Sequence, residues 1–283
     1  MNQGFVFNGV FVPKSTLEID PLSPAFANGL GLFETTRLHA GRILFLGPHI
    51  ERMRGTARRL EIDFPVDEKR AFADVATLVR NRGLIDARIR LQLLVRADEK
   101  SDVLWTGETW APLENPGAVM TIGKAAPLYN GMTAMPGLKT TNYMANRLAE
   151  REGRKQGHGE VVFDLPDGTV TEGTRSTLFF CRGRKLHTPG LDLHILPGVT
   201  RQVVLEVARE RGIEVEEGRY SWAEVQAADE VFMTGSVGGL RPVRAVEGRA
   251  IRQAPGPVTL ELAQAYGRRA DGEPLLSRGA DCV

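Results

Sequence analysis

Lys139 and Glu172 are two ionisable residues whose types suit one kind of chemistry. Lys139 lies in the run Leu-Lys-Thr-Thr-Asn-Tyr, and Glu172 follows 33 residues later in the run Val-Thr-Glu-Gly-Thr-Arg. A lysine amine can form a Schiff base with an aldehyde. A carboxylate can keep a pyridine nitrogen protonated, so that the ring withdraws electrons from a neighbouring carbanion. The pair therefore supplies the two groups that pyridoxal phosphate chemistry requires, although a solvated lysine and glutamate on the surface have the same residue types.

Two segments have the composition of phosphate-binding turns. The run Leu196-Pro-Gly-Val-Thr-Arg201 leads directly into a predicted helix, whose first N–H groups and positive dipole end attract anions. The run Thr234-Gly-Ser-Val-Gly-Gly239 closes a predicted strand with small residues, which let an anion approach the backbone. Each run is also compatible with an ordinary loop-to-helix junction or a glycine-rich turn.

Several arginines are further candidates for anion binding. Arg52 interrupts the apolar side of a predicted helix, and its fork of donors suits a phosphate, although most helical arginines are solvated. Arg88, Arg90 and Arg175 lie on or near predicted strands and are expected to hold a substrate carboxylate, unless at least one of them is a surface residue. His49 is interpreted as a packed structural histidine. A metal site is unsupported, because His, Cys and carboxylate residues do not cluster at ligand spacing.

The composition is that of an ordinary soluble protein. The 283 residues include 42% hydrophobic and 25% charged residues, and this length fits two domains. The 36 Lys and Arg residues nearly balance the 35 Asp and Glu residues, so no net field favours nucleic acid or a membrane. Cys181 and Cys282 form no disulfide framework, and no stretch approaches ~18 apolar residues or resembles a leader. We expect a cytoplasmic protein.

The elements that must position these residues follow from periodicity. In the first half, Ala87–Val95 alternates polar residues with Ile, Leu and Val, which gives a strand one polar and one apolar face. The other expected elements are a hairpin over Gly4–Pro13, a strand over Leu30–Ala40, helices over Pro48–Leu60 and Val66–Arg82, a loop over Thr106–Pro116 and a strand over Ala118–Ile122.

The second half is expected to form another mixed α/β unit. The turn Pro166-Asp-Gly168 joins strands over Glu160–Leu165 and Thr169–Glu172. Helices are expected over Tyr143–Gln156, Val199–Arg211 and Pro257–Arg268, with strands near Ser176–Cys181, Lys185–His187, Ile213–Glu217, Glu230–Thr234 and Pro242–Val246. We expect an N-terminal domain over residues 1–122, a linker rich in Pro and Gly over 123–137, and a C-terminal domain over 138–283.

Taken together, the motifs resemble one family over nearly the whole chain. The motifs occur in the order Gly31-Leu-Phe-Glu-Thr-Thr-Arg37, His49-Ile-Glu-Arg52, Lys139-Thr-Thr-Asn-Tyr143, Thr171-Glu-Gly173, Leu196-Pro-Gly-Val-Thr-Arg201 and Asp229-Glu-Val-Phe-Met-Thr-Gly-Ser236. This order resembles the class IV, or fold-type IV, pyridoxal-phosphate aminotransferases. That family includes branched-chain aminotransferases, D-amino-acid aminotransferases and aminodeoxychorismate lyases.

The resemblance implies a fold, a cofactor and a set of site residues. It implies two α/β domains with pyridoxal 5'-phosphate at their interface and a homodimer that completes each site. Lys139 is the implied Schiff-base lysine and Glu172 the implied partner of the pyridine nitrogen. The residues expected to contact the rest of the cofactor are Arg52, Tyr143, Val199, Thr200 and Ser236, and those expected to contact substrate are Phe33, Arg88, Arg90 and Arg175.

The resemblance implies transamination between an amino acid and an α-keto acid such as 2-oxoglutarate. Branched-chain members carry Tyr-x-Arg where this chain has Arg88-Ile-Arg90, so the extra arginines favour a D-amino acid such as D-alanine or D-glutamate. The Asp229–Ser236 segment resembles the branched-chain branch instead, and that alternative stays open. An aminodeoxychorismate lyase, with its Lys-x-x-Asn spacing, and a cofactor-free anion-binding scaffold are the remaining alternatives.

Overall fold

The computed structural model describes residues 3–16, 18, 20–110, 119–126 and 137–276. These residues divide into two compact units. The first unit comprises Met1–Pro112, Lys139–Asn142 and Ala270–Val283, and the second comprises Leu113–Leu138 and Tyr143–Arg269. Across the described residues, no helix has both the length and the apolar character needed to cross a membrane.

The described part of the first unit is built on a six-stranded sheet with the strand order β2-β1-β6-β5-β3-β4. Its long central strands pair antiparallel, β3 with β5 and β5 with β6. The elements are β1 (Gly4–Phe7), β2 (Val10–Pro13), η1 (Lys14–Thr16), α1 (Pro24–Ala27), β3 (Gly31–His39), β4 (Arg42–Ile43), α2 (Leu46–Arg59), α3 (Glu68–Arg82), β5 (Ala87–Val95) and β6 (Ser101–Thr109).

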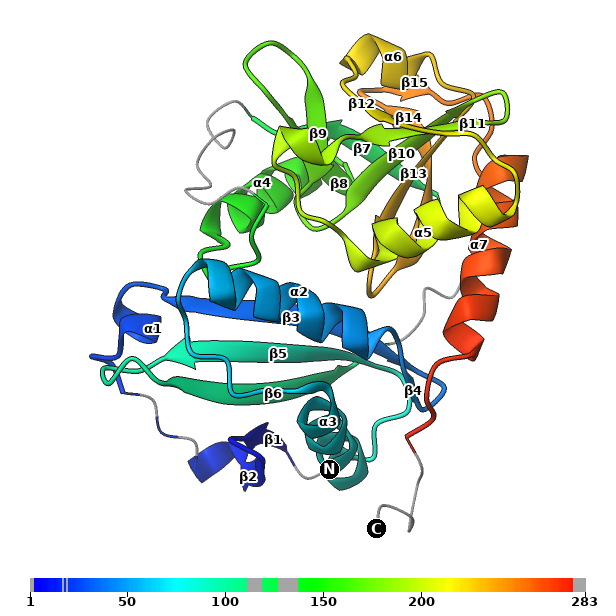
Figure 1. Ribbon diagram of the computed structural model, residues 1–283. Helices are drawn as coiled ribbons and strands as arrows, with labels where there is room; N and C mark the ends of the chain where they lie inside the picture. The colour runs from blue at the N-terminus through cyan, green and yellow to red at the C-terminus, as the bar shows by residue number, and fades with distance from the viewer. Residues whose placement is uncertain (1–2, 17, 19, 111–118, 127–136, 277–283) are drawn as a thin grey trace. The chain divides into compact units, whose positions relative to one another are not determined.

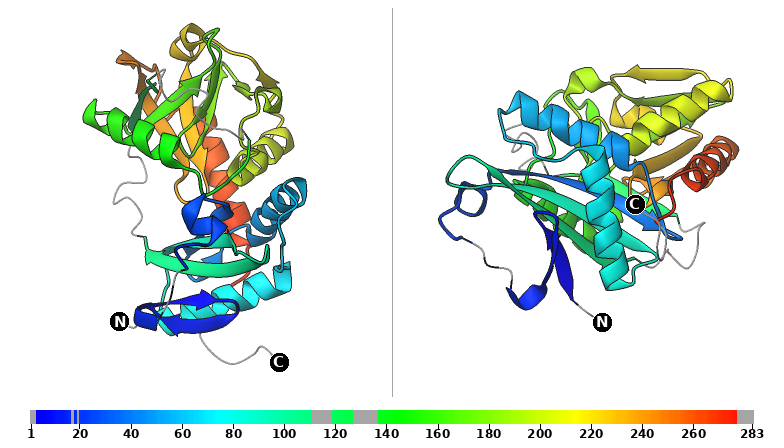
Figure 2. Two further views of the ribbon diagram at one scale, coloured as in Figure 1. Left: turned by 90° about the vertical axis from the view of Figure 1, so that its left-hand side faces the viewer. Right: turned by 60° about the horizontal axis from the view of Figure 1, so that its bottom comes forward.

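Alternation along β5 sets the orientation of this sheet. Ile89, Leu91 and Leu93 are buried in the core, as their period-2 spacing predicts, while Arg88 and Arg90 lie on the opposite face. The helices α2 and α3 cover the apolar face (Figure 1, Figure 2) and contribute Ile50, Met53, Val75 and Leu78 to the same core. The helix α3 has sharp ends, because the Asp67 side chain accepts from the Arg70 N–H and Gly83 takes a left-handed conformation.

The second unit holds a nine-stranded sheet among its described residues, in the order β12-β11-β10-β13-β14-β7-β8-β9, with β15 paired to β14. Its elements are β7 (Met120–Lys124), α4 (Met144–Lys155), β8 (Glu160–Asp164), β9 (Val170–Gly173), β10 (Thr177–Arg182), β11 (Lys185–Pro189), η3 (Leu191–Leu193), α5 (Val199–Glu210), β12 (Val215–Gly218), α6 (Trp222–Gln226), β13 (Glu230–Gly235), β14 (Gly239–Val246), β15 (Arg249–Ala250) and α7 (Pro257–Asp271).

This second sheet curls until its last strand, β9, contacts β10 and β11. Helix α4 packs against β8, and helix α5 packs against β12 and β13 (Figure 1). The core is filled mainly by the apolar faces of β10, β13 and β14, including Leu178, Phe180, Met233 and Val243. This second unit contains the β9–β10 connection, the β13–β14 turn and the start of α5.

The structure differs from the expected organisation in two respects. Residues 106–109 continue strand β6, which pairs with β5 over its whole length, so the loop expected over Thr106–Pro116 begins later. Strand β7 pairs with β14 and β8 in the second sheet, whereas the sequence placed it in the first domain. Residues 127–136 of the expected linker and residues 111–116 of the expected loop lie outside the described residues.

Candidate active site

Lys139 is carried by a short extended segment beside β3 in the first unit. The Phe33 N–H donates to the Lys139 carbonyl at 3.1 Å, and the Thr141 N–H donates to the Gly31 carbonyl at 2.9 Å. The Thr141 hydroxyl also donates to the Gly29 carbonyl at 2.6 Å. These hydrogen bonds fix the backbone of Lys139 relative to β3.

The side chain of Lys139 lies against the aromatic ring of Phe33. The Lys139 Nζ atom is 4.5 Å from the ring centroid, and the guanidinium carbon of Arg90 is 3.9 Å from the same centroid. Phe33 itself is 4% exposed. Thr35 faces Arg90 across the β3–β5 ladder, so Phe33 and Arg90 share one face of the sheet. Because ring faces attract cations, Phe33 gathers an amine and a guanidinium at one place.

On the helix-covered face of the same strand, Glu34 binds two residues of α2. Arg52 donates to Glu34 through Nε at 2.8 Å and through Nη2 at 2.6 Å. His49 Nδ1 is 2.7 Å from Glu34 Oε2, and a carboxylate can only accept, so neutral His49 donates from Nδ1. His49 is 1% exposed, which confirms that it is a packed histidine. The bidentate contact fixes the Arg52 guanidinium, which the sequence assigned to phosphate binding.

Burial and charge act in opposite directions on these groups. Burial alone would raise the pKa of Glu34, but the Arg52 charge and the His49 contacts hold it well below its usual range. Burial lowers the pKa of His49, and the charges of Arg52 and Lys139 lower it further against the opposing effect of Glu34. The triad is therefore an ionised Glu34–Arg52 pair with a neutral His49.

In the second unit, the first turn of α5 has the features of an anion site. Gly198 caps the helix without a side chain, and the first turn carries no acidic residue. The first N–H groups of an α-helix have no intrahelical partner. Thr200 is 2% exposed, and its hydroxyl has no hydrogen-bond partner within the described residues. A buried hydroxyl without a partner is costly, and an anion bound at this helix end would satisfy it.

The β13–β14 turn lies next to this helix end. Thr177 of β10 pairs with Thr234 of β13, and a Cβ atom on Gly198 would lie 3.1 Å from the Thr177 hydroxyl oxygen. Thr234 has a buried hydroxyl that likewise lacks a partner in the described part of the chain, and half-buried Ser236 follows two residues later. Thr177 therefore connects the two segments that the sequence assigned to phosphate binding.

Glu172 is joined to the same region through Leu196. The Leu196 N–H donates to both carboxylate oxygens of Glu172, at 3.1 and 3.2 Å. Leu196 precedes Pro197-Gly198, which begins α5. The second unit thus brings together Glu172, Val199, Thr200 and the segment that contains Ser236, four of the predicted cofactor-binding positions.

The structure gives other predicted residues partners or places them elsewhere. Arg88 forms an ion pair with Glu108, and Arg175 forms one with Glu150 at 2.7 Å. Tyr143 is the first residue of the second unit after the Lys139 segment, and it caps α4. Sequence reasoning assigned no role to two buried acids, Glu34 and Glu160.

Comparison with known proteins identifies the family. The model of the class IV amino-transferase family matches residues 31–246. The chain is 31% identical over 274 residues to an aminodeoxychorismate lyase of Bacillus subtilis, covering 92% of each chain. It is 30% identical over 292 residues to the branched-chain-amino-acid aminotransferase of Escherichia coli K12, covering 94% of this chain and 93% of the relative.

A solved structure shows the same fold. The crystal structure of the Escherichia coli branched-chain amino acid aminotransferase has a TM-score of 0.86 at 26% identity and covers 95% of this chain and 94% of its own. Another branched-chain amino acid aminotransferase of this fold was solved with pyridoxamine 5'-phosphate. The matched motifs, the mixed α/β fold of type IV and these relatives together show that the chain belongs to the class IV aminotransferases, which are pyridoxal-phosphate-dependent enzymes.

Proposed function

We propose that the protein transfers an amino group between an amino acid and an α-keto acid such as 2-oxoglutarate, with Lys139 as its catalytic lysine. The main support is the position of Lys139 Nζ and the Arg90 guanidinium against the one ring of Phe33. An amine that handles the α-proton and a cation that holds a carboxylate are needed at neighbouring positions.

Pyridoxal phosphate, when bound, supplies a ring that withdraws electrons from the α-carbon of the amino acid. In this proposal Glu172 keeps the pyridine nitrogen protonated, and the Leu196 N–H orients its carboxylate. The Val199 and Thr200 end of α5, together with Ser236 and Arg52, holds the phosphate. Lys139 Nζ acts as the general base that moves the α-proton. Tyr143 remains a proposed cofactor contact.

For the substrate, we propose a branched-chain amino acid as the first candidate. The preference for a D-amino acid depended on three arginines, but Arg88 is paired with Glu108 and Arg175 with Glu150. Arg90 lies beside Lys139 against the ring of Phe33, which suits a substrate that carries a carboxylate. The likeness to branched-chain-amino-acid aminotransferases supports the branched side chain. D-alanine or D-glutamate is the second candidate. The likeness to the Bacillus subtilis lyase makes aminodeoxychorismate the third.

Chemical trapping tests the role of Lys139. Borohydride treatment of the yellow holoenzyme should remove its colour and leave the reduced cofactor on the Lys139 peptide. Lys139→Ala should lower turnover by orders of magnitude, while Lys155→Ala, at an exposed lysine of α4, should not change it. An unmodified Lys139 peptide after reduction would contradict the proposal.

Arg90→Leu tests the carboxylate contact. We expect a loss of roughly tenfold to a hundredfold in kcat/KM, because a charge-assisted hydrogen bond contributes about 1.5–3 kcal/mol. Arg88→Leu, on the same face of β5, is the matched control and should change kcat/KM by less than about threefold, because exposed ion pairs contribute little.

The assays pair 2-oxoglutarate with L-leucine, D-alanine or D-glutamate, and a separate assay follows the cleavage of aminodeoxychorismate. A loss in Arg90→Leu of less than about threefold, as small as that expected for Arg88→Leu, would show that Arg90 does not bind substrate. Turnover of D-glutamate far above L-leucine would restore the D-amino acid as first candidate.

We also propose that the enzyme is a homodimer in the cytoplasm. The support is the family pattern stated above and the free, buried thiol of Cys181, which suits a reducing compartment. Sedimentation velocity measures the assembly state, and a monomer at micromolar concentration would argue against the dimer.

A further inference from the structure

A buried glutamate outside the predicted site, Glu160, holds the connection between β9 and β10. This connection runs from Gly173 to Ser176, directly after Glu172 and directly before Thr177. It therefore joins the residue proposed for the pyridine nitrogen to the residue that links the two phosphate segments. Any displacement of this connection changes the spacing between those two parts.

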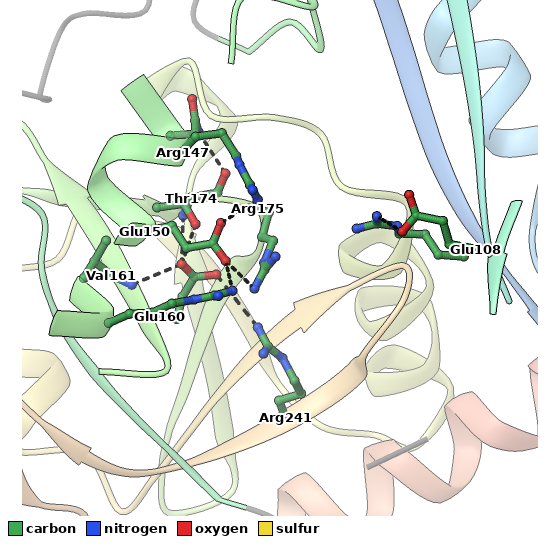
Figure 3. Close-up of polar contacts among 11 residues, drawn as sticks. Glu108, Arg147, Glu150, Glu160, Val161, Thr174, Arg175 and Arg241 are labelled. Atoms are coloured by element: carbon green, nitrogen blue, oxygen red, sulfur yellow. Dashed lines mark hydrogen bonds and ion pairs between the residues drawn. The ribbon is translucent and has the colours of Figure 1, made fainter. Parts of the chain in front are cut away.

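Glu160 binds the connection through both carboxylate oxygens (Figure 3). Its Oε1 accepts from the Thr174 hydroxyl at 2.6 Å and from the Thr174 N–H at 3.3 Å. Its Oε2 accepts from the Ser176 hydroxyl at 2.8 Å. The N–H of Val161 adds a fourth donor at 3.1 Å. The side chain is 1% exposed, so these bonds are shielded from water.

The rest of the connection is held on its other sides. Asn146 of α4 donates to the Thr174 carbonyl at 2.8 Å, and the Gly173 N–H donates to the Ser176 carbonyl at 2.7 Å. Arg175 pairs with Glu150 of α4, as Figure 3 shows. The connection is thus a fixed turn whose main anchor is the Glu160 carboxylate.

This turn lies against the proposed phosphate site. A Cβ atom on Gly235 would lie 3.4 Å from the Arg175 carbonyl oxygen, so the turn contacts the residue before Ser236. Gly235 ends β13, and Arg241 lies on the next strand of that hairpin, β14. The Nη2 atom of Arg241 is 3.8 Å from Glu160 Oε2. Burial lowers the pKa of Arg241, and the Glu160 charge opposes that effect. Glu160 therefore anchors the turn and also balances a half-buried cation of the β13–β14 hairpin.

We infer that Glu160 is a positioning residue for pyridoxal phosphate: it sets the spacing between Glu172 and the phosphate segments without touching the cofactor. This inference rests on the proposed function of those residues. In metal sites, partners that orient the ligating residues change affinity by about tenfold to a hundredfold when removed, and we expect a similar range for Glu160.

Glu160→Gln tests the inference, because glutamine keeps the shape but loses the charge and one acceptor. We expect pyridoxal phosphate to bind the full-length variant roughly tenfold to a hundredfold more weakly, measured by tryptophan fluorescence after the cofactor is removed and titrated back. The affinity for pyridoxal, which lacks the phosphate, should fall less, because the turn abuts Gly235.

Glu230→Gln is a matched control in the same unit. Glu230 is 2% exposed and accepts from two backbone N–H groups and a hydroxyl, those of Val258 and Thr259, at 2.7–3.0 Å. It lies four residues before Thr234 on β13, about 13 Å away at the usual strand rise. Glu230→Gln should lower the melting temperature as much as Glu160→Gln does, yet change the affinity for pyridoxal phosphate by less than about twofold.

Equal losses of affinity in the two variants would reduce Glu160 to a general stabilising residue and overturn the inference. If Glu160→Gln does not fold, Ser176→Ala removes one bond to the same carboxylate, and unchanged affinity in Ser176→Ala would overturn the inference as well. A wild-type chain that binds no pyridoxal phosphate would instead contradict the proposed function.

Discussion

At the scale of single residues, Glu34, His49 and Arg52 show how burial and neighbouring charges together set the charge of a buried group. Glu34 accepts two hydrogen bonds from Arg52 and one from His49. Breaking such a pair leaves an uncompensated buried charge, which is strongly destabilising. The arrangement keeps Arg52 in one orientation but requires His49 to remain neutral, and this requirement makes folding sensitive to acid.

Acidification should destabilise the protein through His49. Its folded-state pKa is lowered from 6.5, so below pH 6.5 the unfolded chain takes up a proton that the folded chain resists. Stability is therefore complete above that pH and falls as the pH decreases, by at most about 1.4 kcal/mol per pH unit for this group. Urea unfolding at pH 7.5 and 5.5 measures the loss, and His49→Asn, which keeps a donor to Glu34, should show a smaller one.

His187 needs a separate control, because burial lowers its pKa too. His187→Asn reports the share of the pH dependence that arises in the second unit. Glu34 has a lowered pKa as well, but its contribution is lost only below about pH 4.5, outside this window. A pH dependence that is the same in His49→Asn and the wild type would show that His49 titrates normally in the folded protein.

At the scale of elements, the start of α5 combines N–H groups that lack intrahelical partners with a hydroxyl that lacks a hydrogen bond within the described residues. The hydroxyl of Thr200 is buried and lacks a partner among the described residues. Such a group lowers the stability of the cofactor-free protein, and the proposed phosphate would compensate it. In this proposal, the first turn of α5 lowers the stability of the cofactor-free protein and raises its affinity for the phosphate.

Thr200→Val should separate these two quantities. The change keeps the shape, so the cofactor-free protein should be as stable as the wild type or more stable, while pyridoxal phosphate binds about tenfold more weakly. Thr188→Val is the opposite case, because the buried Thr188 hydroxyl donates to the Leu178 carbonyl at 2.8 Å. It should cost about 1 kcal/mol in unfolding free energy and leave the affinity unchanged. Unchanged affinity in Thr200→Val would exclude the Thr200 hydroxyl from the phosphate site.

At the scale of the whole molecule, local patterns predicted most elements and missed long-range pairings. The alternation in β5 and the apolar spacing in α3 depend on neighbouring residues, and the sequence located the ends of both elements within two residues. The assignment of β7 to the second sheet depends on pairing with β14 and β8, which lie up to about 120 residues away in the chain. The end of β6 was missed because Thr106, Gly107 and Glu108 interrupt its apolar pattern.

The candidate site likewise has features that local motifs predicted and features that depend on residues of other elements. Motif order predicted a catalytic lysine, a partner for the pyridine nitrogen and two phosphate segments, and these roles stay predictions. Which of the strand arginines lies beside the lysine depends on partners such as Glu108, Phe33 and Glu150, which come from other elements. The buried acids Glu34 and Glu160 could not be distinguished from surface glutamates, because their burial depends on donors 14 to 18 residues away.

The segment Lys139–Asn142 groups with the first unit, although the residues before and after it belong to the second. A chimaera that joins residues 1–137 of this chain to the remainder of a homologue would therefore take the amine proposed as reactive from one parent and the strand that anchors it from the other. Recombination that respects the architecture has to exchange the tetrapeptide together with β3, as one inherited block.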